Sequence, residues 1–177
     1  MNIEFDELKL MLIDAPLAPD ELLRSGALPS EIEEAETMIH RRLPTDLKSW
    51  LAVVNAVCVG GGGFVGVNAK RKSLDLCCIF KNYPSWKENG WFPIASDGSG
   101  NYYVLVDNGS EKGVAFIDVA EDSETLTYRV ASNLRIFISR FIEKESGDSR
   151  WPFDKLDTLN RDPAVETELD PENRARC

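Results

Sequence analysis

Positive charge is scarce in this chain of 177 residues. Lysine and arginine number 20 against 30 aspartates and glutamates, which gives a formal net charge of -10 and a pI of about 4.7. A protein that grips nucleic-acid phosphates needs a basic patch, and an anionic membrane surface also attracts basic segments. The composition therefore argues against both partners. It favours a cationic protein partner, because an acidic surface steers basic molecules during encounter.

Metal-ligating side chains are few and badly spaced. The only histidine is His40, and the four cysteines form no C-x-x-C pair. Those cysteines are Cys58, Cys77, Cys78 and Cys177. Structural zinc sites need several such ligands at short, regular spacings. We therefore expect no metal and no cofactor.

Long apolar runs are absent, including at the start of the chain, "MNIEFDELKLMLIDAPLAPDE". A signal peptide or a membrane span would need such a run. The sequence predicts a cytoplasmic protein, and in that compartment the cysteines stay reduced.

Catalytic motifs are also missing. The glycine run from Gly60 to Gly63 lacks the lysine and hydroxyl residue of a phosphate-binding loop, and no G-x-S-x-G element occurs. The segment "DGSGNYYVLVDN" resembles a calcium loop only at its start. Tyr102 stands where that loop needs glycine, and Asn108 stands where it needs a bidentate glutamate. No motif places a base or a nucleophile beside His40, so we expect a protein that is not an enzyme.

Helical patterns flank a region of strands. Ser30 and Glu33 predict a capping box at the start of a helix that runs to about residue 43, and Pro44 or Thr45 predicts the start of a second helix. Near the end of the domain, Ser132 is the predicted N-cap of a helix with an apolar stripe. The glycine run predicts a loop between the second helix and the strands.

Alternating apolar residues predict strands at 73–80, 91–95, 101–107 and 113–119, and "TLTYRV" predicts one more. The adjacent pair Cys77 and Cys78 would then point to opposite faces. Turn dipeptides at Asp97-Gly98 and Asn108-Gly109 join successive strands. The predicted fold class is α+β, with one mostly antiparallel sheet packed by N-terminal helices and a C-terminal helix.

The domain is expected to span residues 1–147. Residues 148–177 then form a C-terminal extension that packs back on the domain or is partly mobile, with Trp151 and Phe153 as anchors and a short helix beginning at Pro163.

Charge is segregated along the chain. Between residues 97 and 124, seven acids oppose one lysine, whereas the stretch from Lys70 to Lys87 carries five cations and only Asp75 against them. We interpret the acids as a face for a cationic partner, with nearby aromatic rings as anchors. The predicted partner-binding residues are Asp97, Asp118, Glu121, Asp122, Glu124, Trp86 and Tyr102. The alternative is that the acids lie in solvated turns and that the rings pack in the core.

Taken together, these segments resemble the SUKH superfamily. The pattern is a helix with a glutamate, Leu-Pro, an apolar helix, an Ile-Ala-x-x-x-x-Gly strand pair and an Ala-x-Asn-Leu helix start. The matching residues are Glu36, Leu43, Pro44, Ile94, Ala95, Gly100, Ala131, Asn133 and Leu134. One departure is Asn55-Ala56, where the family has Asn-Gly. The turn after the second helix should therefore differ, and the glycine run is a candidate to supply it.

The resemblance implies a non-enzymatic binding protein. Bacterial members look like immunity proteins that bind and neutralise a cognate toxin, often a nuclease, in the cytoplasm. The implied partner is a protein toxin with a basic surface. The sequence is also compatible with a homodimer. Fungal members resemble regulators and scaffolds of cell-wall synthesis, which is the alternative reading.

Overall fold

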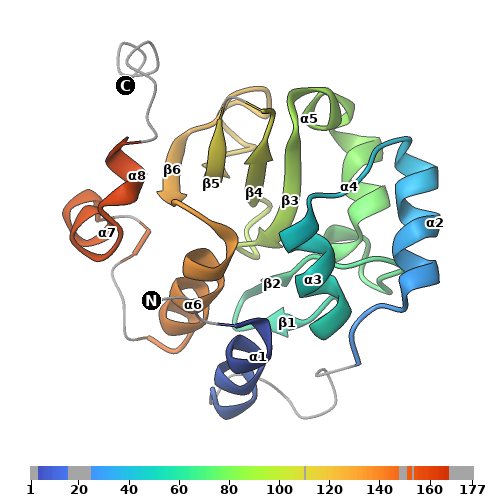
Figure 1. Cartoon of the computed structure of the whole chain (residues 1–177). Coiled ribbons are helices and arrows are strands. Elements are labelled where there is room, and N and C mark those ends of the chain that lie inside the picture. Colours follow the sequence, from blue (N-terminus) through green and yellow to red (C-terminus); the bar gives the residue numbers. More distant parts are fainter. Residues whose placement is uncertain (1–3, 16–24, 110, 148–150, 153, 168–177) are drawn as a thin grey trace.

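The structure is a computed structural model that describes residues 4–15, 25–109, 111–147, 151–152 and 154–167 (Figure 1). Its centre is a six-stranded sheet in which every strand pairs antiparallel with the next one along the chain. The strands are β1 (Cys58–Val59), β2 (Gly62–Phe64), β3 (Trp91–Ser96), β4 (Tyr102–Asp107), β5 (Lys112–Ile117) and β6 (Tyr128–Ala131). The predicted α+β class with one antiparallel sheet is confirmed.

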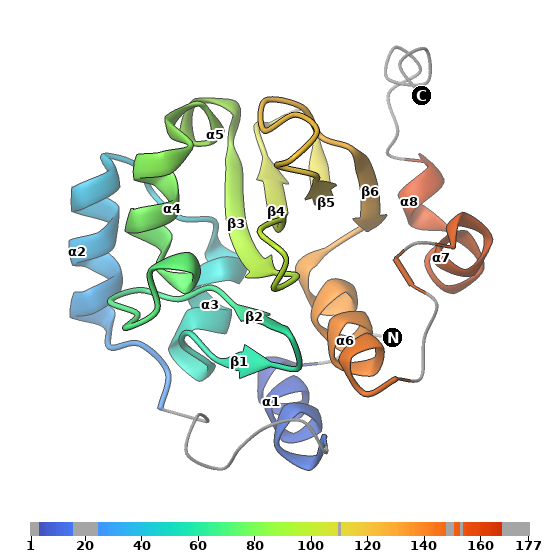
Figure 2. The ribbon, with the colours of Figure 1, turned by 180° about the vertical axis from the view of Figure 1, so that it is seen from behind.

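Helices cover both faces of this sheet. They are α1 (Phe5–Asp14), α2 (Pro29–Ile39), α3 (Thr45–Val53), α4 (Leu76–Asn82), α5 (Pro84–Asn89), α6 (Leu134–Glu145), α7 (Lys155–Arg161) and α8 (Ala164–Thr167). Two opposite views show α2 and α4 at the side of β3, and α7 and α8 at the other side, next to β6 (Figures 1 and 2). Among the described residues, no helix has the length and apolar character needed to cross a membrane.

Aromatic rings fix which helices pack on which face. On one face Phe64 of β2 lies 5.2 Å from the ring of Trp50 in α3 and 5.0 Å from Phe141 in α6. On the other face Tyr102 of β4 lies 5.7 Å from the ring of Trp86 in α5. Phe92 of β3 is on the face of Phe64 and meets Phe80 of α4 edge to face at 6.2 Å. Because large rings bury most of their area in such contacts, they account for much of the core.

The glycine run is a hairpin rather than a plain loop. Gly60 and Gly61 form its tip, and Gly62 and Gly63 belong to β2. A Cβ atom on Gly62 would lie 2.0 Å from the backbone oxygen of Ser96 in β3. Only glycine allows this close approach of two backbones. The approach brings the hairpin tip against the β3–β4 turn, where a Cβ atom on Gly98 would meet the oxygen of Gly61 at 2.0 Å.

The predicted strand at residues 73–80 is wrong. The segment forms a short 3-10 turn, η2 (Lys72–Leu74), followed by α4. Asp75 is the N-cap of this helix, and its carboxylate accepts the amide of Cys78 at 2.9 Å. Leu76, Ile79 and Phe80 are buried at spacings that suit a helix, and so short an apolar run fits either structure. The adjacent cysteines therefore lie on a helix and not on opposite faces of a strand.

Two predicted caps are displaced by one or two residues. Helix α2 begins at Pro29, and its first turn is closed by Glu31, whose carboxylate accepts the amide of Leu28 at 2.8 Å. Proline is favoured at this position because it has no amide to leave unpaired. Helix α6 is capped by Asn133 rather than Ser132, since the Asn133 side chain accepts the amide of Ile136 at 3.0 Å.

The turn after α3 keeps a left-handed residue without glycine. Ala56 has a φ of 51°, and the side chain of Asn55 holds both the amide and the carbonyl of Val67, at 2.8 and 3.1 Å. The glycine run was only a candidate to supply this turn, and Ala56 itself adopts the left-handed conformation. The cost of a left-handed conformation for a residue with a Cβ atom is about 1–2 kcal/mol.

Ala56→Gly should therefore raise the free energy of unfolding by about 0.5–1 kcal/mol, the relief of strain less the extra entropy of an unfolded glycine. Urea denaturation measures the change. The matched control is Ala52→Gly on the exposed side of α3, which should lower stability by about 0.5–1 kcal/mol. A loss of stability in both variants would show that Ala56 is not strained.

The C-terminal extension packs on β6. Trp151 is buried, donates its indole N–H to the carbonyl of Val130 at 2.9 Å, and stacks on Tyr103 at 6.0 Å. The buried carboxylate of Asp162 accepts the amide of Ser132 at 2.7 Å. A helix was predicted from Pro163, and α8 begins one residue later, whereas α7 was not predicted. Phe153 lies outside the described residues.

Candidate partner-binding site

Two acidic segments meet at one end of the sheet. The register pairs Ser96 with Tyr102, and Tyr102 with Ile117. The β3–β4 turn, residues 97–101, therefore lies beside the start of the β5–β6 loop, residues 118–127. We call the carboxylates of these two segments the acidic edge, which consists of Asp97, Asp118, Glu121, Asp122 and Glu124.

Asn101 ties the two segments together. Its amide nitrogen donates to Oδ2 of Asp97 at 2.9 Å, and its Oδ1 accepts the backbone amide of Val119 at 3.0 Å. The turn and the loop are thereby fixed relative to each other. The sequence predicted that these acids act together, and the pairing of the strands brings them to one edge.

The three aspartates of the acidic edge hold their own turns. Oδ1 of Asp97 accepts the amides of Ser99 and Asn101 at 2.8 and 3.1 Å. Oδ1 of Asp118 accepts two amides that follow it, at 3.1 and 3.2 Å, and Oδ1 of Asp122 accepts the amide of Glu124 at 2.8 Å. Such bonds are the usual work of aspartate in turns. These residues shape the edge as well as charge it.

The two glutamates are free to bind. Glu121 and Glu124 are exposed, and within the described residues no ion pair engages either carboxylate. They project from a loop whose backbone is already fixed by Asp118 and Asp122. A cationic partner could pair with them without first breaking an internal interaction.

The two predicted aromatic anchors are buried. Trp86 is 0% exposed and Tyr102 is 7% exposed, and their rings lie 5.7 Å apart. The indole N–H of Trp86 donates to the carbonyl of Ser123 at 2.7 Å. Both rings therefore support the acidic loop from beneath and do not line the surface. The alternative reading of the sequence, core packing, describes them, because rings of this size bury a large area.

The pKa values of Tyr103 and Tyr128 are raised mainly by burial and further by acids of the acidic edge. Burial raises the pKa of Tyr128 to about 12, and the charges of Asp118 and Asp97 add to this effect. Burial, Tyr128 and Asp97 likewise raise the pKa of Tyr103. A neighbouring negative charge disfavours a phenolate, so Asp97 acts on both tyrosines in the same direction as burial.

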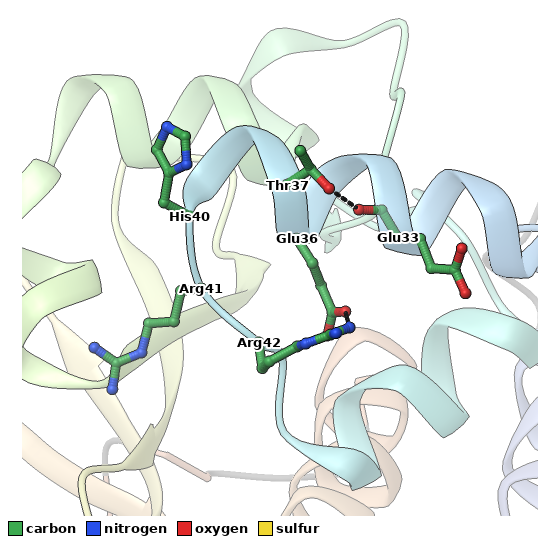
Figure 3. Close-up of a pocket in the computed structure, with 6 residues that line it drawn as sticks. All are labelled: Glu33, Glu36, Thr37, His40, Arg41 and Arg42. Atoms are coloured by element: carbon green, nitrogen blue, oxygen red, sulfur yellow. Dashed lines mark hydrogen bonds and ion pairs between the residues drawn. The ribbon is translucent and has the colours of Figure 1, made fainter.

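A shallow hollow of about 580 Å³ also lies at the end of α2. Its lining residues are Glu33, Glu36, Thr37, His40, Arg41 and Arg42. Figure 3 shows Arg42 turned toward Glu36 and Arg41 turned away from it. The guanidinium of Arg41 donates to the carbonyl of Lys87 and lies 5.5 Å from the centre of the Phe92 ring, so it joins α2 to α5 and β3.

Glu36, the glutamate of the family pattern, has a structural role. It is 5% exposed and accepts the amide of Leu43 at 2.8 Å, with Arg42 at 2.6 Å and Lys48 at 3.4 Å. Burial acts to raise its pKa, but the Leu43 amide, Arg42 and Lys48 together hold the pKa below its usual value. Glu36 thus fixes the connection from α2 to α3. The sequence pattern marked the residue and gave no sign of these partners.

Glu36→Gln should lower the free energy of unfolding by about 1–3 kcal/mol at neutral pH. The glutamine Oε1 can still accept the Leu43 amide, but the negative charge that pairs with Arg42 and Lys48 is lost and an NH2 group replaces one acceptor oxygen. A lowered pKa stabilises the fold above the unfolded-state pKa, and this contribution is lost as the pH falls through the folded-state pKa. The difference from the parent protein should therefore shrink near pH 3. Denaturation at both pH values measures it, with the exposed Glu34→Gln as control. An equal difference at the two pH values would contradict the assigned role.

Within the part of the chain that the structure describes, no three histidine, cysteine, aspartate or glutamate side chains gather as metal ligands. His40 is exposed at the end of α2.

Comparison with known proteins agrees with the resemblance drawn from the sequence. A search of curated proteins finds no match. The model of the SMI1 / KNR4 family (SUKH-1) matches residues 26–140, which include the strands, α2 to α5, the first part of α6 and the acidic edge. The chain belongs to the SMI1/KNR4 (SUKH-1) family.

Proposed function

We propose that this protein is a non-enzymatic immunity protein, which binds a cognate toxin through the acidic edge and neutralises it in the cytoplasm. The observation that carries the proposal is the gathering of five carboxylates on one end of the sheet, two of them exposed and in no ion pair with any described residue. Membership of the family supports a binding role and is equally compatible with a cell-wall regulator.

The acidic edge suits a partner with a basic groove. A nuclease toxin carries such a groove to hold phosphates, and Glu121 and Glu124 would occupy it in place of phosphate charge. Complementary charge accelerates encounter by about 10- to 1,000-fold, which matters when a toxin must be captured quickly. The protein would block access to the groove and would change no covalent bond.

The edge is preformed for this task. Asn101 fixes the turn to the loop, and Trp86 holds the loop from beneath through the carbonyl of Ser123. A preformed surface loses less conformational freedom when it binds, so more of the interaction energy appears as affinity.

Co-expression tests the proposal directly. The protein is expressed together with the product of the adjacent gene, and cell survival and co-purification are scored. We expect survival and a stable complex. Equal killing with and without this protein would contradict the immunity function. The alternative is tested by deleting the gene of this protein in cells that make no toxin. Viable cells with an altered cell wall would favour a regulator of the SMI1/KNR4 type.

A further inference from the structure

A basic loop lies next to the acidic edge and forms no ion pair among the described residues. Lys70, Arg71 and Lys72 are consecutive and exposed, between β2 and α4. Within the described residues, no ion pair joins any of the three to a carboxylate. The one side-chain hydrogen bond that these cations make there is weak, from the Arg71 guanidinium to Sγ of Cys58 at 3.7 Å. In a chain with a formal net charge of -10, three neighbouring cations without an acidic partner form a distinct surface.

The backbone of this basic loop is held on both sides. Before it, the side chain of Asn55 bonds the amide and the carbonyl of Val67. Within it, Oδ2 of Asp75 accepts the amide of Ala69 at 2.9 Å, and the carbonyl of Arg71 accepts the amide of Leu74 at 2.9 Å. The three cations therefore project from a fixed scaffold, as the glutamates of the acidic edge do.

Tyr102 joins the basic loop to the acidic edge. Its hydroxyl donates to the carbonyl of Ser73, directly after the three cations, at 3.3 Å. Its backbone follows Asn101, which binds Asp97. Burial raises the pKa of Tyr102, Asp97 raises it further, and Arg71 opposes this effect. The ring thus lies between the two charged surfaces.

We propose that the basic loop and the acidic edge form one bipolar surface, which binds a protein partner that carries a basic patch and neighbouring carboxylates. The inference rests on the proposed function and adds that Lys70, Arg71 and Lys72 contact acidic side chains of the same partner. Opposite charges side by side fix the orientation of a bound protein and reject wrong partners. A continuous polyanion such as nucleic acid fits less well. The acidic edge would repel its next phosphates, and three cations make few phosphate contacts.

A two-block peptide tests whether the two surfaces act together. The probe has six glutamates and six arginines joined by ten glycine and serine residues, a linker with a mean span of about 17 Å. We expect it to bind the full chain at least about tenfold more tightly than hexa-arginine alone, because the second contact becomes intramolecular. Isothermal titration calorimetry at low salt measures both affinities.

Matched variants assign the gain to the basic loop. Lys70→Ser/Arg71→Ser/Lys72→Ser should abolish the gain and leave the affinity for hexa-arginine equal to that of the control. The control Lys9→Ser/Lys112→Ser/Lys155→Ser removes three cations elsewhere and so has the same net charge, and it should keep the gain. Circular dichroism checks that both variants fold.

Three outcomes would overturn the inference. The two-block peptide could show no gain over hexa-arginine, or the control variant could lose the gain as fully as the loop variant. An oligo-dT of twelve nucleotides could also bind the basic loop more tightly than hexa-glutamate does. That result would identify the loop as a nucleic-acid-binding surface. The proposed function is tested separately by hexa-arginine. It fails if Glu121→Lys/Glu124→Lys binds this peptide as tightly as Glu33→Lys/Glu34→Lys does.

Discussion

Under the proposed immunity function, Glu121→Lys/Glu124→Lys should slow association with the toxin by about tenfold or more and abolish protection of the cell. Both side chains are exposed and unengaged within the described structure, so reversal changes the field that the partner meets and leaves the fold intact. Stopped-flow or surface-plasmon measurements give the association rate constant at low and physiological salt. The parent protein should lose its rate advantage as salt rises, because exposed charges are screened over about 8 Å at physiological ionic strength.

A second double variant tests whether the position of the charges, and not only the net charge of the protein, governs association. Glu33→Lys/Glu34→Lys makes the same change in net charge on the exposed side of α2. It should slow association only slightly. Equal slowing by the two double variants would mean that overall charge, and not the acidic edge, governs encounter.

Substitutions of the aspartates in the acidic edge must be interpreted differently from those of the glutamates. Asp97→Ala removes the acceptor of two backbone amides in the β3–β4 turn as well as a charge. A loss of binding in that variant would mix a change of shape with a change of charge. The glutamates are therefore the residues on which the electrostatic claim is tested cleanly.

Trp151→Ala should lower the free energy of unfolding by about 3–5 kcal/mol, although Trp151 lies outside the residues that the family model matches. The ring is buried between Tyr103 and Phe137, at 6.0 and 5.7 Å, and its N–H satisfies the carbonyl of Val130. The substitution would leave a cavity and expose the free edge of β6. Urea denaturation followed by fluorescence or circular dichroism measures the loss.

Leu156→Ala is the matched control in the same extension. Leu156 is 72% exposed on α7, so its removal should change stability by less than about 0.5 kcal/mol. If Trp151→Ala also cost less than about 1 kcal/mol, the extension would be an accessory segment and not part of the core.

Much of the fold could be predicted because the strands from Trp91 onward carry strong local signals. Turn dipeptides at Asp97-Gly98 and Asn108-Gly109 separate runs of apolar residues, and β3, β4 and β5 begin and end within two residues of their predicted bounds. The segment at 73–80 failed for the opposite reason. Its apolar residues fit both periods, and the deciding interaction is a single cap by Asp75.

The sequence predicted the grouping of the acids in the candidate site, but it did not predict that the two aromatic rings are buried. The acids follow one another along the chain, and an antiparallel meander returns alternate turns to the same end of the sheet. Sequence could not show that Trp86 and Tyr102 are covered, because exposure depends on α5 and on the Ser123 carbonyl 37 residues away. The partners of Glu36 were hidden for the same reason.

The most direct test of the acidic edge as a cation-binding surface is an amide chemical-shift map of the labelled protein titrated with hexa-arginine. We predict the largest shifts at residues 97–101 and 118–124, reduced by added salt. Shifts of equal size at the exposed acids of α1 and α2, such as Asp6 and Glu33, would contradict the claim.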